Sequence, residues 1–424
     1  MNRIMKESGI PLVGNIPIHW NKKPIKYCTL INERVLSETT SNDYLFRYID
    51  IGSVDFYKGI MYYEELSFNT APSRARRIVK KGDVIVSTVR TYLKAVAEIT
   101  DDIDVIVSTG FAVLTPKPEI EPRYLAYFCK SNAFCDEIER NSYGISYPAI
   151  NSSALGCLEI TLPPLDEQII ISNLLDKKCE KIDKLISLEE TAITELKDYK
   201  KSIIQKAVTK GIKKSRKLKN SGIEWIGDIP EEWDIVPIGG IYQTRNTKVS
   251  DKDYMPLSVG YMGVVPQLEN AAKTDDGDNR KLVLKNDFVI NSRADRRGAC
   301  GISELYGSVS LINIVLKPLK NAFNNYYRYL FKSTNFSDEF YKWGNGIVDD
   351  LWSTKWSDMK RIFIPIPPYN EQKEIADYLD KKQNCIDNLI LLKQQKIAEL
   401  KEYKKSLIYE YVTGKKQTPK KDTK

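Results

Sequence analysis

The sequence predicts a mixed α+β fold in which two α/β domains are separated by two long helices that pair as an antiparallel coiled coil. The first observation behind this prediction is an internal repeat in a chain of 424 residues. Pro163-Pro164-Leu165-Asp166-Glu167-Gln168 returns as Pro367-Pro368-Tyr369-Asn370-Glu371-Gln372, 204 positions later. The second is that a long segment with apolar residues at heptad spacing follows each copy. Together they predict a pseudo-two-fold internal repeat.

Further repeats frame two variable regions. Residues 195–202 return as residues 399–406 with one difference in eight positions, and residues 9–20 are echoed by residues 222–233 at an offset of 213. The regions between these framing segments differ in length and mostly in sequence. We therefore expect two modules of related fold that do the same job on different targets.

The variable regions, residues 20–162 and 233–366, are expected to be mixed α/β. Short β-branched runs such as Val84–Thr88, separated by turn residues, predict strands. A helix is expected near residues 121–140, and its counterpart near residues 323–342.

Residues 166–209 and 370–413 are expected to form the long helices. Asp166 and Asn370 follow a Pro-Pro pair that ends the preceding strand, and both residue types are good N-caps. About 40 residues at ~1.5 Å per residue would span ~60 Å. The predicted seam residues are Leu175, Ile182, Leu185, Leu196, Tyr199 and Ile203 in the first helix, and Leu379, Ile386, Leu389, Leu400, Tyr403 and Leu407 in the second.

A narrow apolar seam with charged flanks needs a partner helix. The simplest partner is the other copy, and an antiparallel pair would place the variable domains at opposite ends with approximate two-fold symmetry. The alternative is that each helix packs on its own domain or on another subunit. Glu189 and Lys393 interrupt the seam near the helix midpoints. They either pair and fix the register or remain solvated.

Composition narrows the class of protein. The formal net charge of +8 permits a polyanionic partner without requiring one. No apolar run approaches the ~20 residues that cross a bilayer, and the N-terminus lacks a signal segment, so a cytoplasmic protein without membrane contact is expected. The seven cysteines are scattered without a Cys-x-x-Cys pair, which argues against zinc sites and disulfides. The single histidine, His19, is expected to be structural.

The sequence lacks the common motifs of enzymes. It has no Gly-x-x-x-x-Gly-Lys-Ser/Thr loop, no Gly-x-Gly-x-x-Gly after a strand and no Gly-x-Ser-x-Gly elbow. Pro367-Pro368-Tyr369 resembles part of the base-gripping loop of adenine methyltransferases, but Ile366 stands where that loop needs Asn or Asp. We therefore expect no catalytic residue, no metal site and no cofactor in this chain.

The order of framing and variable segments, with Pro-Pro-Leu-x-Glu-Gln opening a long helix twice, resembles the specificity subunits of Type I restriction-modification enzymes. Residues 225–233, residues 399–408 and Gly82–Leu93, the last typical of a target-recognition domain, support the resemblance. It covers nearly the whole chain. Asn15–Trp20 departs from the pattern, because it lacks the acidic residues of the second copy.

The resemblance implies that each variable region is a target-recognition domain that reads one half of a bipartite site in double-stranded DNA. The helices would space the halves and dock two methyltransferase (modification) subunits that bring S-adenosylmethionine. Motor-nuclease (restriction) subunits would add chemistry that needs ATP and Mg. The implied division is 1–162, first target-recognition domain with the N-terminal repeat segment; 163–211, first long helix; 212–232, basic linker and repeat segment; 233–366, second target-recognition domain; 367–414, second long helix; and 415–424, basic tail.

Contacts to DNA are expected from Lys and Arg on phosphates and from Arg, Asn and Gln on base edges. A solvated surface charge is the alternative for each candidate. Asp295 is expected to hold a neighbouring Arg, and Trp352 and Trp356 are expected in the core more than on DNA. The candidates are Arg74, Arg76, Arg77, Arg90, Lys94, Tyr143 and Tyr147 in the first domain, Arg293, Arg296, Arg297 and Lys355 in the second, and Lys213, Lys214 and Arg216 in the basic run 210–219.

Two other functions remain open at this point. One is a non-enzymatic adaptor with two modules that bind RNA or protein partners on a coiled-coil scaffold. The other is a self-contained methyltransferase or nuclease, which the missing motifs disfavour.

Overall fold

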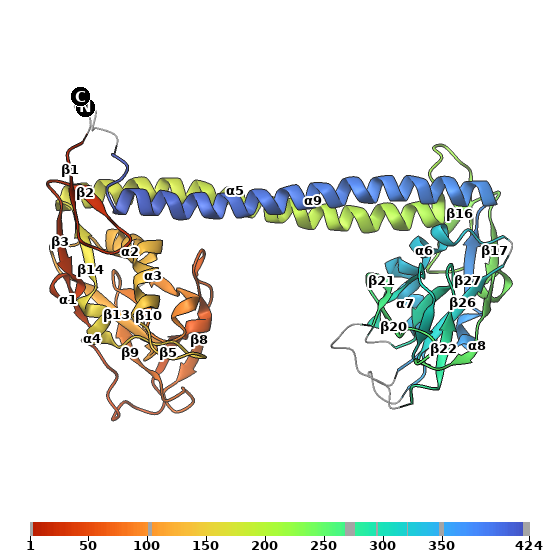
Figure 1. The fold of residues 1–424 in the computed structure, drawn as a ribbon, viewed down its shortest axis with the longest axis horizontal. Helices are drawn as coiled ribbons and strands as arrows, with labels where there is room; N and C mark the ends of the chain where they lie inside the picture. Colours follow the sequence, from red (N-terminus) through yellow and green to blue (C-terminus); the bar gives the residue numbers. More distant parts are fainter. Residues whose placement is uncertain are drawn as a thin grey trace. The chain divides into compact units, whose positions relative to one another are not determined.

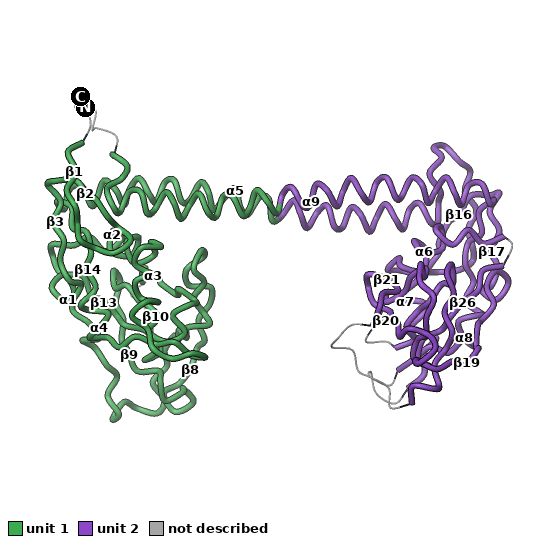
Figure 2. Tube along the Cα trace, viewed as in Figure 1, with its two compact units in different colours: residues 1–190, 394–424 green, residues 191–393 purple. Residues whose placement is uncertain are grey.

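The computed structural model describes residues 3–100, 104–267, 276–293, 296–319, 321–346 and 352–418. The chain divides into two compact units (Figure 2). Unit 1 comprises residues 1–190 and 394–424, and unit 2 comprises residues 191–393. Each unit therefore contains one β-rich domain together with a part of each long helix.

Unit 1 is built on two four-stranded sheets with the orders β11-β10-β13-β4 and β8-β5-β12-β9, in which only β12 and β5 are parallel among the pairs described. Three two-stranded pairs, β1-β2, β14-β3 and β6-β7, complete it. The strands are β1 Met5–Glu7, β2 Asn15–Pro17, β3 Asn21–Pro24, β4 Thr29–Ile31, β5 Leu45–Ile49, β6 Val54–Asp55, β7 Gly59–Ile60, β8 Glu64–Ser67, β9 Ala75–Val79, β10 Val84–Ser87, β11 Val96–Glu98, β12 Val105–Ser108, β13 Phe111–Pro116 and β14 Glu159–Leu162. The helices are α1 Ile25–Cys28, α2 Pro122–Lys130, α3 Asn132–Arg140 and α4 Ser152–Cys157, with short 3-10 turns η1 Ile51–Ser53 and η2 Thr91–Leu93.

Unit 2 repeats the first of these sheets as β18-β26-β23-β24 and adds the sheet β19-β22-β25. Its two-stranded pairs are β15-β16, β17-β27 and β20-β21. The strands are β15 Leu218–Asn220, β16 Asp228–Pro230, β17 Asp234–Pro237, β18 Tyr242–Thr244, β19 Lys248–Val249, β20 Leu257–Gly260, β21 Gly263–Pro266, β22 Arg280–Val283, β23 Phe288–Asn291, β24 Cys300–Ile302, β25 Gly307–Val309, β26 Asn313–Pro318 and β27 Phe363–Ile366. The helices are α6 Asn324–Lys332, α7 Thr334–Lys342 and α8 Trp356–Met359, with the 3-10 turn η3 Ile238–Gly240.

The helix expected near residues 121–140 is two helices, and so is its counterpart near residues 323–342. A serine separates the two helices in each unit, and its hydroxyl accepts a hydrogen bond from a backbone N–H of the second helix: Ser131 from Phe134 and Ser333 from Phe336. A serine in this position is a favourable N-cap, because it satisfies an amide that the helix leaves unpaired. The serine near the middle of each predicted segment therefore starts a second helix.

The long helices are α5, Leu165–Lys210, and α9, Tyr369–Val412 (Figure 1). Both begin one residue before the expected Asp and Asn, so these residues lie in the first turn and not at the N-cap. The helices pack together, and ion pairs give their direction within each unit. In unit 1, Asp183 pairs with Lys404 at 2.7 Å and Glu189 with Lys396 at 2.6 Å. Because the α9 numbers fall as the α5 numbers rise, the helices are antiparallel there.

Unit 2 contains the equivalent ion pair: Asp387 contacts Lys200 at 2.7 Å. Asp387 and Lys404 are the repeat mates of Asp183 and Lys200, at the offset of 204. The same antiparallel pairing therefore occurs in both units. The expected pair between Glu189 and Lys393 involves both units and stays a prediction.

The seam differs from the expected one in its second row. Leu175, Ile182, Leu379, Ile386 and Leu407 are at most 5% exposed, and Leu196, Ile203 and Leu400 are half-buried. The second row lies one position further along: Ile186 and Ile193 are buried, and Ile390 and Ile397 are half-buried. Residues three and four positions apart are both neighbours on a helix surface, and the seam uses the second spacing. The correction concerns Leu185, Tyr199, Leu389 and Tyr403, which are 44%, 54%, 43% and 51% exposed.

Candidate nucleic-acid interface

The glutamate of each Pro-Pro-x-x-Glu-Gln segment joins the start of a long helix to the preceding framing segment. In unit 1, the indole N–H of Trp20 donates to Glu167 at 3.0 Å, and Arg3 and His19 contact the same carboxylate at 2.5 and 2.8 Å. In unit 2, Trp233 donates to Glu371 at 3.2 Å, and Arg216 forms a bidentate pair with that carboxylate. Both tryptophans are fully buried. The repeated motif is thus a buried structural joint.

The glutamine of the same segment joins the long helix to the β-rich domain of its unit. In unit 1, Gln168 accepts the N–H of Glu121 at 2.9 Å and donates to the carbonyl of Glu119 at 3.1 Å. In unit 2, Gln372 accepts the N–H of Phe323 at 2.9 Å. Each glutamine therefore holds the segment that leads into the first of the two consecutive short helices of its unit, which is α2 in unit 1 and α6 in unit 2.

A tyrosine on that helix reaches the last turn of the opposite long helix. The hydroxyl of Tyr124 donates to the carbonyl of Val412 at 3.1 Å, and that of Tyr326 donates to the carbonyl of Val208 at 2.8 Å. These carbonyls lie at helix C-termini, where intrahelical partners are missing. Both tyrosines are buried, and burial raises the pKa of each phenol. Each β-rich domain is therefore attached to both long helices within its unit.

The Glu167 joint predicts a pH dependence. Burial alone would raise the pKa of Glu167, but hydrogen bonds from His19, Trp20 and Arg3 outweigh it and lower the pKa. A lowered folded-state pKa stabilises the fold above the usual glutamate value of about 4.3, and this stability is lost as the pH falls through the lowered value. We expect Glu167→Gln to remove this part of the acid sensitivity of unit 1. Urea unfolding between about pH 6 and pH 3 measures it, with Glu159→Gln, which breaks an exposed pair with Lys22, as the control. Equal acid sensitivity in both variants would contradict the assignment.

In unit 1 the first arginine cluster lies on or near β9. Arg74 is 57% exposed and contacts Asp50 at 2.8 Å and the hydroxyl of Tyr48 at 3.2 Å. Arg76 lies over the ring of Phe68 at 4.8 Å. Arg77 is half-buried, its Nε has no hydrogen-bond partner among the described residues, and burial lowers its pKa. Arg74 thus presents the most accessible guanidinium of the three.

The second group of candidates surrounds the turn η2. Arg90 has a left-handed backbone conformation, φ 52°, is exposed, and lies over the ring of Tyr147 at 5.4 Å. Tyr143 and Tyr147 are 80% and 67% exposed. Lys94 differs, because it pairs with Asp136 at 2.7 Å and Glu139 at 3.4 Å on α3. The structure brings Arg90 and the two tyrosines together and ties Lys94 to a helix.

In unit 2, Arg293, Arg296 and Arg297 are exposed. Arg297 pairs with Asp338 at 3.0 Å, and Asp338 is the repeat mate of Asp136. Asp295 lies outside the described residues. Lys355 precedes α8 and is exposed, whereas Trp352 and Trp356 are half-buried; the indole N–H of Trp352 donates to the carbonyl of Tyr341 at 2.9 Å.

The basic run forms one wall of a cavity of about 610 Å³ in unit 2. Lys213 and Lys214 are exposed, and Lys213 has a long contact of 3.9 Å with Glu374. Arg216 differs: it is 10% exposed, and hydrogen bonds to Glu371 and Glu232 raise its pKa. The described residues that line the cavity include Lys206 and Lys210 but no Asp or Glu. The positive charge of these side chains favours the binding of an anion in this cavity.

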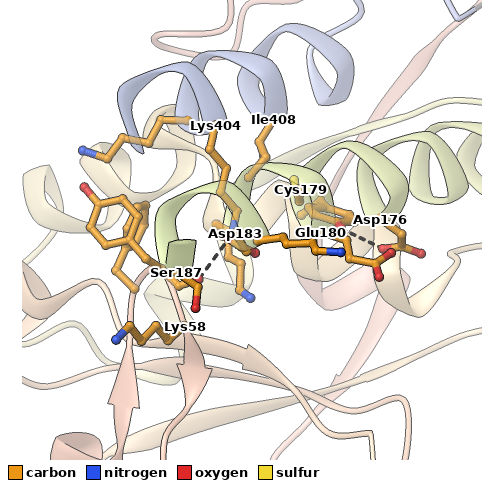
Figure 3. Close-up of a pocket in the computed structure, with 14 residues that line it drawn as sticks. Lys58, Asp176, Cys179, Glu180, Asp183, Ser187, Lys404 and Ile408 are labelled. Atoms are coloured by element: carbon orange, nitrogen blue, oxygen red, sulfur yellow. Dashed lines mark hydrogen bonds and ion pairs between the residues drawn. The ribbon is translucent and has the colours of Figure 1, made fainter. Parts of the chain in front are cut away.

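Sequence reasoning missed a contact between the β6–β7 turn and the helices of unit 1. A cavity of about 670 Å³ lies beside this contact. Figure 3 shows side chains that line it, with Lys404 and Asp183 facing each other across the helix pair. The ring of Tyr57 lies 5.0 Å from Lys401 and 5.2 Å from Lys405, and its carbonyl accepts from Lys404 at 3.3 Å. An aromatic pair next to a Lys-Gly turn was the available signal.

The fold and these contacts define a duplicated binding scaffold: two related α+β units with matching joints and different surface loops. Residues 29–198 and 230–402 match the model of the Type I restriction modification DNA specificity domain, and the chain belongs to this family. It is therefore the DNA specificity subunit of a Type I restriction-modification system, a non-catalytic component of that complex. The adaptor and self-contained enzyme alternatives are thereby set aside.

The relatives cover between 73% and 95% of the chain. The specificity subunit described for the type I restriction enzyme MjaX of Methanocaldococcus jannaschii is 26% identical over 95% of both chains. The MjaVIII specificity subunit of the same organism is 24% identical over 73% of this chain and 74% of its own length. The solved HsdS subunit from Thermoanaerobacter tengcongensis, 23% identical, covers 94% of this chain and 98% of its own with a TM-score of 0.54. A chain from a structural study of type I system assembly and conformational transition has a TM-score of 0.73 at 21% identity, covering 94% of this chain and 98% of its own. These two structures share the fold. Among the described residues, no helix is long and apolar enough to span a membrane.

Proposed function

We propose that each unit reads one half of a bipartite DNA target, and that the long helices set the distance between the halves. The observation that supports this is the duplication of the joints. Glu167 and Glu371, Gln168 and Gln372, and Tyr124 and Tyr326 make equivalent contacts in the two units. The exposed loops, in contrast, share little sequence. Two domains that are attached to the helices in the same way but differ in their surface loops suit two different half-sites.

Methylome sequencing of cells with and without the gene tests this proposal. The expected result is a methylated-adenine motif with two defined halves and an undefined spacer that disappears on deletion. Exchange of residues 20–162 for the same region of a relative should change one half only. A methylated motif that remains after deletion of the gene, or a motif that is continuous and not divided into two halves, would contradict the proposal.

The helix pair also carries equivalent apolar patches that suit two copies of one partner. Leu185, Leu188 and Tyr403 are 44%, 57% and 51% exposed in unit 1. Their repeat mates in unit 2, Leu389, Leu392 and Tyr199, are 43%, 60% and 54% exposed. Exposed apolar side chains that recur in this way indicate protein contacts.

The proposed partners are two modification subunits, which supply S-adenosylmethionine, and restriction subunits, which supply the chemistry that needs ATP and Mg. Native mass spectrometry of the assembled complex tests the first contact. Leu188→Asp and Leu392→Asp are each expected to lose one modification subunit, and the double variant both. Retention of two modification subunits by the double variant would contradict the docking site.

The cavity next to the basic run predicts a salt effect. If Lys213 and Lys214 contact phosphates, Lys213→Gln/Lys214→Gln should weaken binding about equally for all DNA sequences. The slope of log affinity against log salt should become shallower by up to about 0.9 for each phosphate that the variant no longer neutralises. Lys177→Gln/Lys181→Gln on α5 is the control with the same charge change. An unchanged slope would show that the run is a solvated linker.

A further inference from the structure

One surface loop of unit 1 exposes three apolar side chains within five residues. Tyr143, Ile145 and Tyr147 are 80%, 103% and 67% exposed. Such a cluster makes no contribution to the core of its own unit, and contiguous exposed apolar side chains mark sites of interaction. Ile145 is the most exposed of the three.

The loop has a defined conformation that presents Ile145. The backbone N–H of Tyr143 donates to the carbonyl of Ala149 at 2.9 Å, and that of Ala149 donates back at 2.9 Å. Gly144 has φ 105°, and a Cβ at this position would lie 3.2 Å from the carbonyl oxygen of Tyr147. Glycine is therefore needed for the chain to turn back there. The loop is thus held in place before any ligand binds, which lowers the entropic cost of a contact.

Cations flank the loop. Arg90 lies over the ring of Tyr147 at 5.4 Å, and Arg140 ends α3 three residues before Tyr143. Both are exposed, and neither has a carboxylate partner among the described residues. The N–H of Thr91 donates to the carbonyl of Pro148 at 3.3 Å, which joins the loop to the turn that carries Arg90. An apolar tip near exposed guanidiniums that lack carboxylate partners is complementary to a base edge near phosphates.

The chemistry of the tip limits what it can recognise. Gly144, Ile145 and Ser146 offer no side chain that could make the bidentate hydrogen bonds by which guanine or adenine is read. The major groove has one apolar feature that differs between bases, the C5-methyl group of thymine. We propose that Ile145 is a specificity-determining residue that contacts a thymine methyl group in the half-site of unit 1, with Arg90 and Arg140 on the neighbouring phosphates. This inference rests on the proposed function.

Single thymine-to-uracil replacements test the contact, because uracil lacks only the methyl group. The assembled modification complex is titrated with duplexes that carry the mapped target and one uracil each. At one position of the half-site of unit 1, uracil should weaken binding by the wild-type complex about fourfold, the value expected for one buried methyl group. Ile145→Ala should bind thymine and uracil duplexes equally at that position, and Ile145→Val should keep most of the difference. Ile4→Ala, which truncates another exposed isoleucine, is the control.

The outcomes separate this inference from the proposed function. Site-specific methylation together with no uracil position that distinguishes wild type from Ile145→Ala would overturn the inference alone. A half-site of unit 1 without thymine would do the same. A 2-aminopurine base placed in the half-site of unit 1 would become strongly unstacked if Ile145 inserted between bases. Unstacking that depends on Ile145 would therefore also overturn the inference. Absence of bipartite methylation by the wild-type complex would instead contradict the proposed function.

Discussion

Glu371→Ala is expected to lower the free energy of unfolding by about 3–5 kcal/mol, because it removes the buried partner of Arg216 and leaves this cation with only the exposed carboxylate of Glu232. The Glu371 side chain is 4% exposed, and the Arg216 side chain that it contacts is 10% exposed. The substitution also removes the acceptor of the Trp233 indole. Urea unfolding of the full chain, followed by tryptophan fluorescence, measures the change.

Glu232→Ala is the matched control, because it removes the other carboxylate that contacts Arg216. The side chain of Glu232 is 51% exposed, and its contact to Arg216 is 2.6 Å. An exposed ion pair contributes little to stability because water screens it, so we expect this variant to unfold nearly as the wild type does. Equal destabilisation in the two variants would show that Arg216 is held by charge in general and not by the buried joint.

Leu379→Ala is expected to lower the free energy of unfolding by about 2–5 kcal/mol. Leu389→Ala is expected to change it by no more than about 0.5 kcal/mol. Both were expected in the seam from their spacing, yet Leu379 is 1% exposed and Leu389 is 43% exposed. The substitutions remove the same atoms from the same helix. The difference between them therefore measures burial against the partner helix.

Thermal and urea unfolding of the two variants provide the measurement. Leu175→Ala, at 0% exposure, should behave as Leu379→Ala does, because Leu175 is its repeat mate in unit 1. Similar costs for Leu379→Ala and Leu389→Ala would contradict the corrected seam. Weaker binding of the modification subunit by Leu389→Ala, without a change in stability, would agree with the proposed docking patch.

The sequence by itself determined the duplication, the two long helices and the family. These properties follow from patterns in the sequence, namely the heptad spacing, the Pro-Pro-x-x-Glu-Gln segment and the offset of 204. Such patterns can be recognised without knowing which segments contact each other in the fold. The helix starts were predicted to within one residue for the same reason, because α5 and α9 begin directly after a Pro-Pro pair.

Only the tertiary structure decided which side chains face a partner. Ile186 and Leu185 both neighbour Ile182 on the helix surface, and the packing of the second helix selects Ile186. Arg216 looked like part of a basic run, but its carboxylate partner Glu371 lies 155 positions away in the sequence. Contacts across such distances depend on the folded chain and leave no periodic signal, so the sequence could not show that Arg216 is held by carboxylates while Lys213 and Lys214 are exposed.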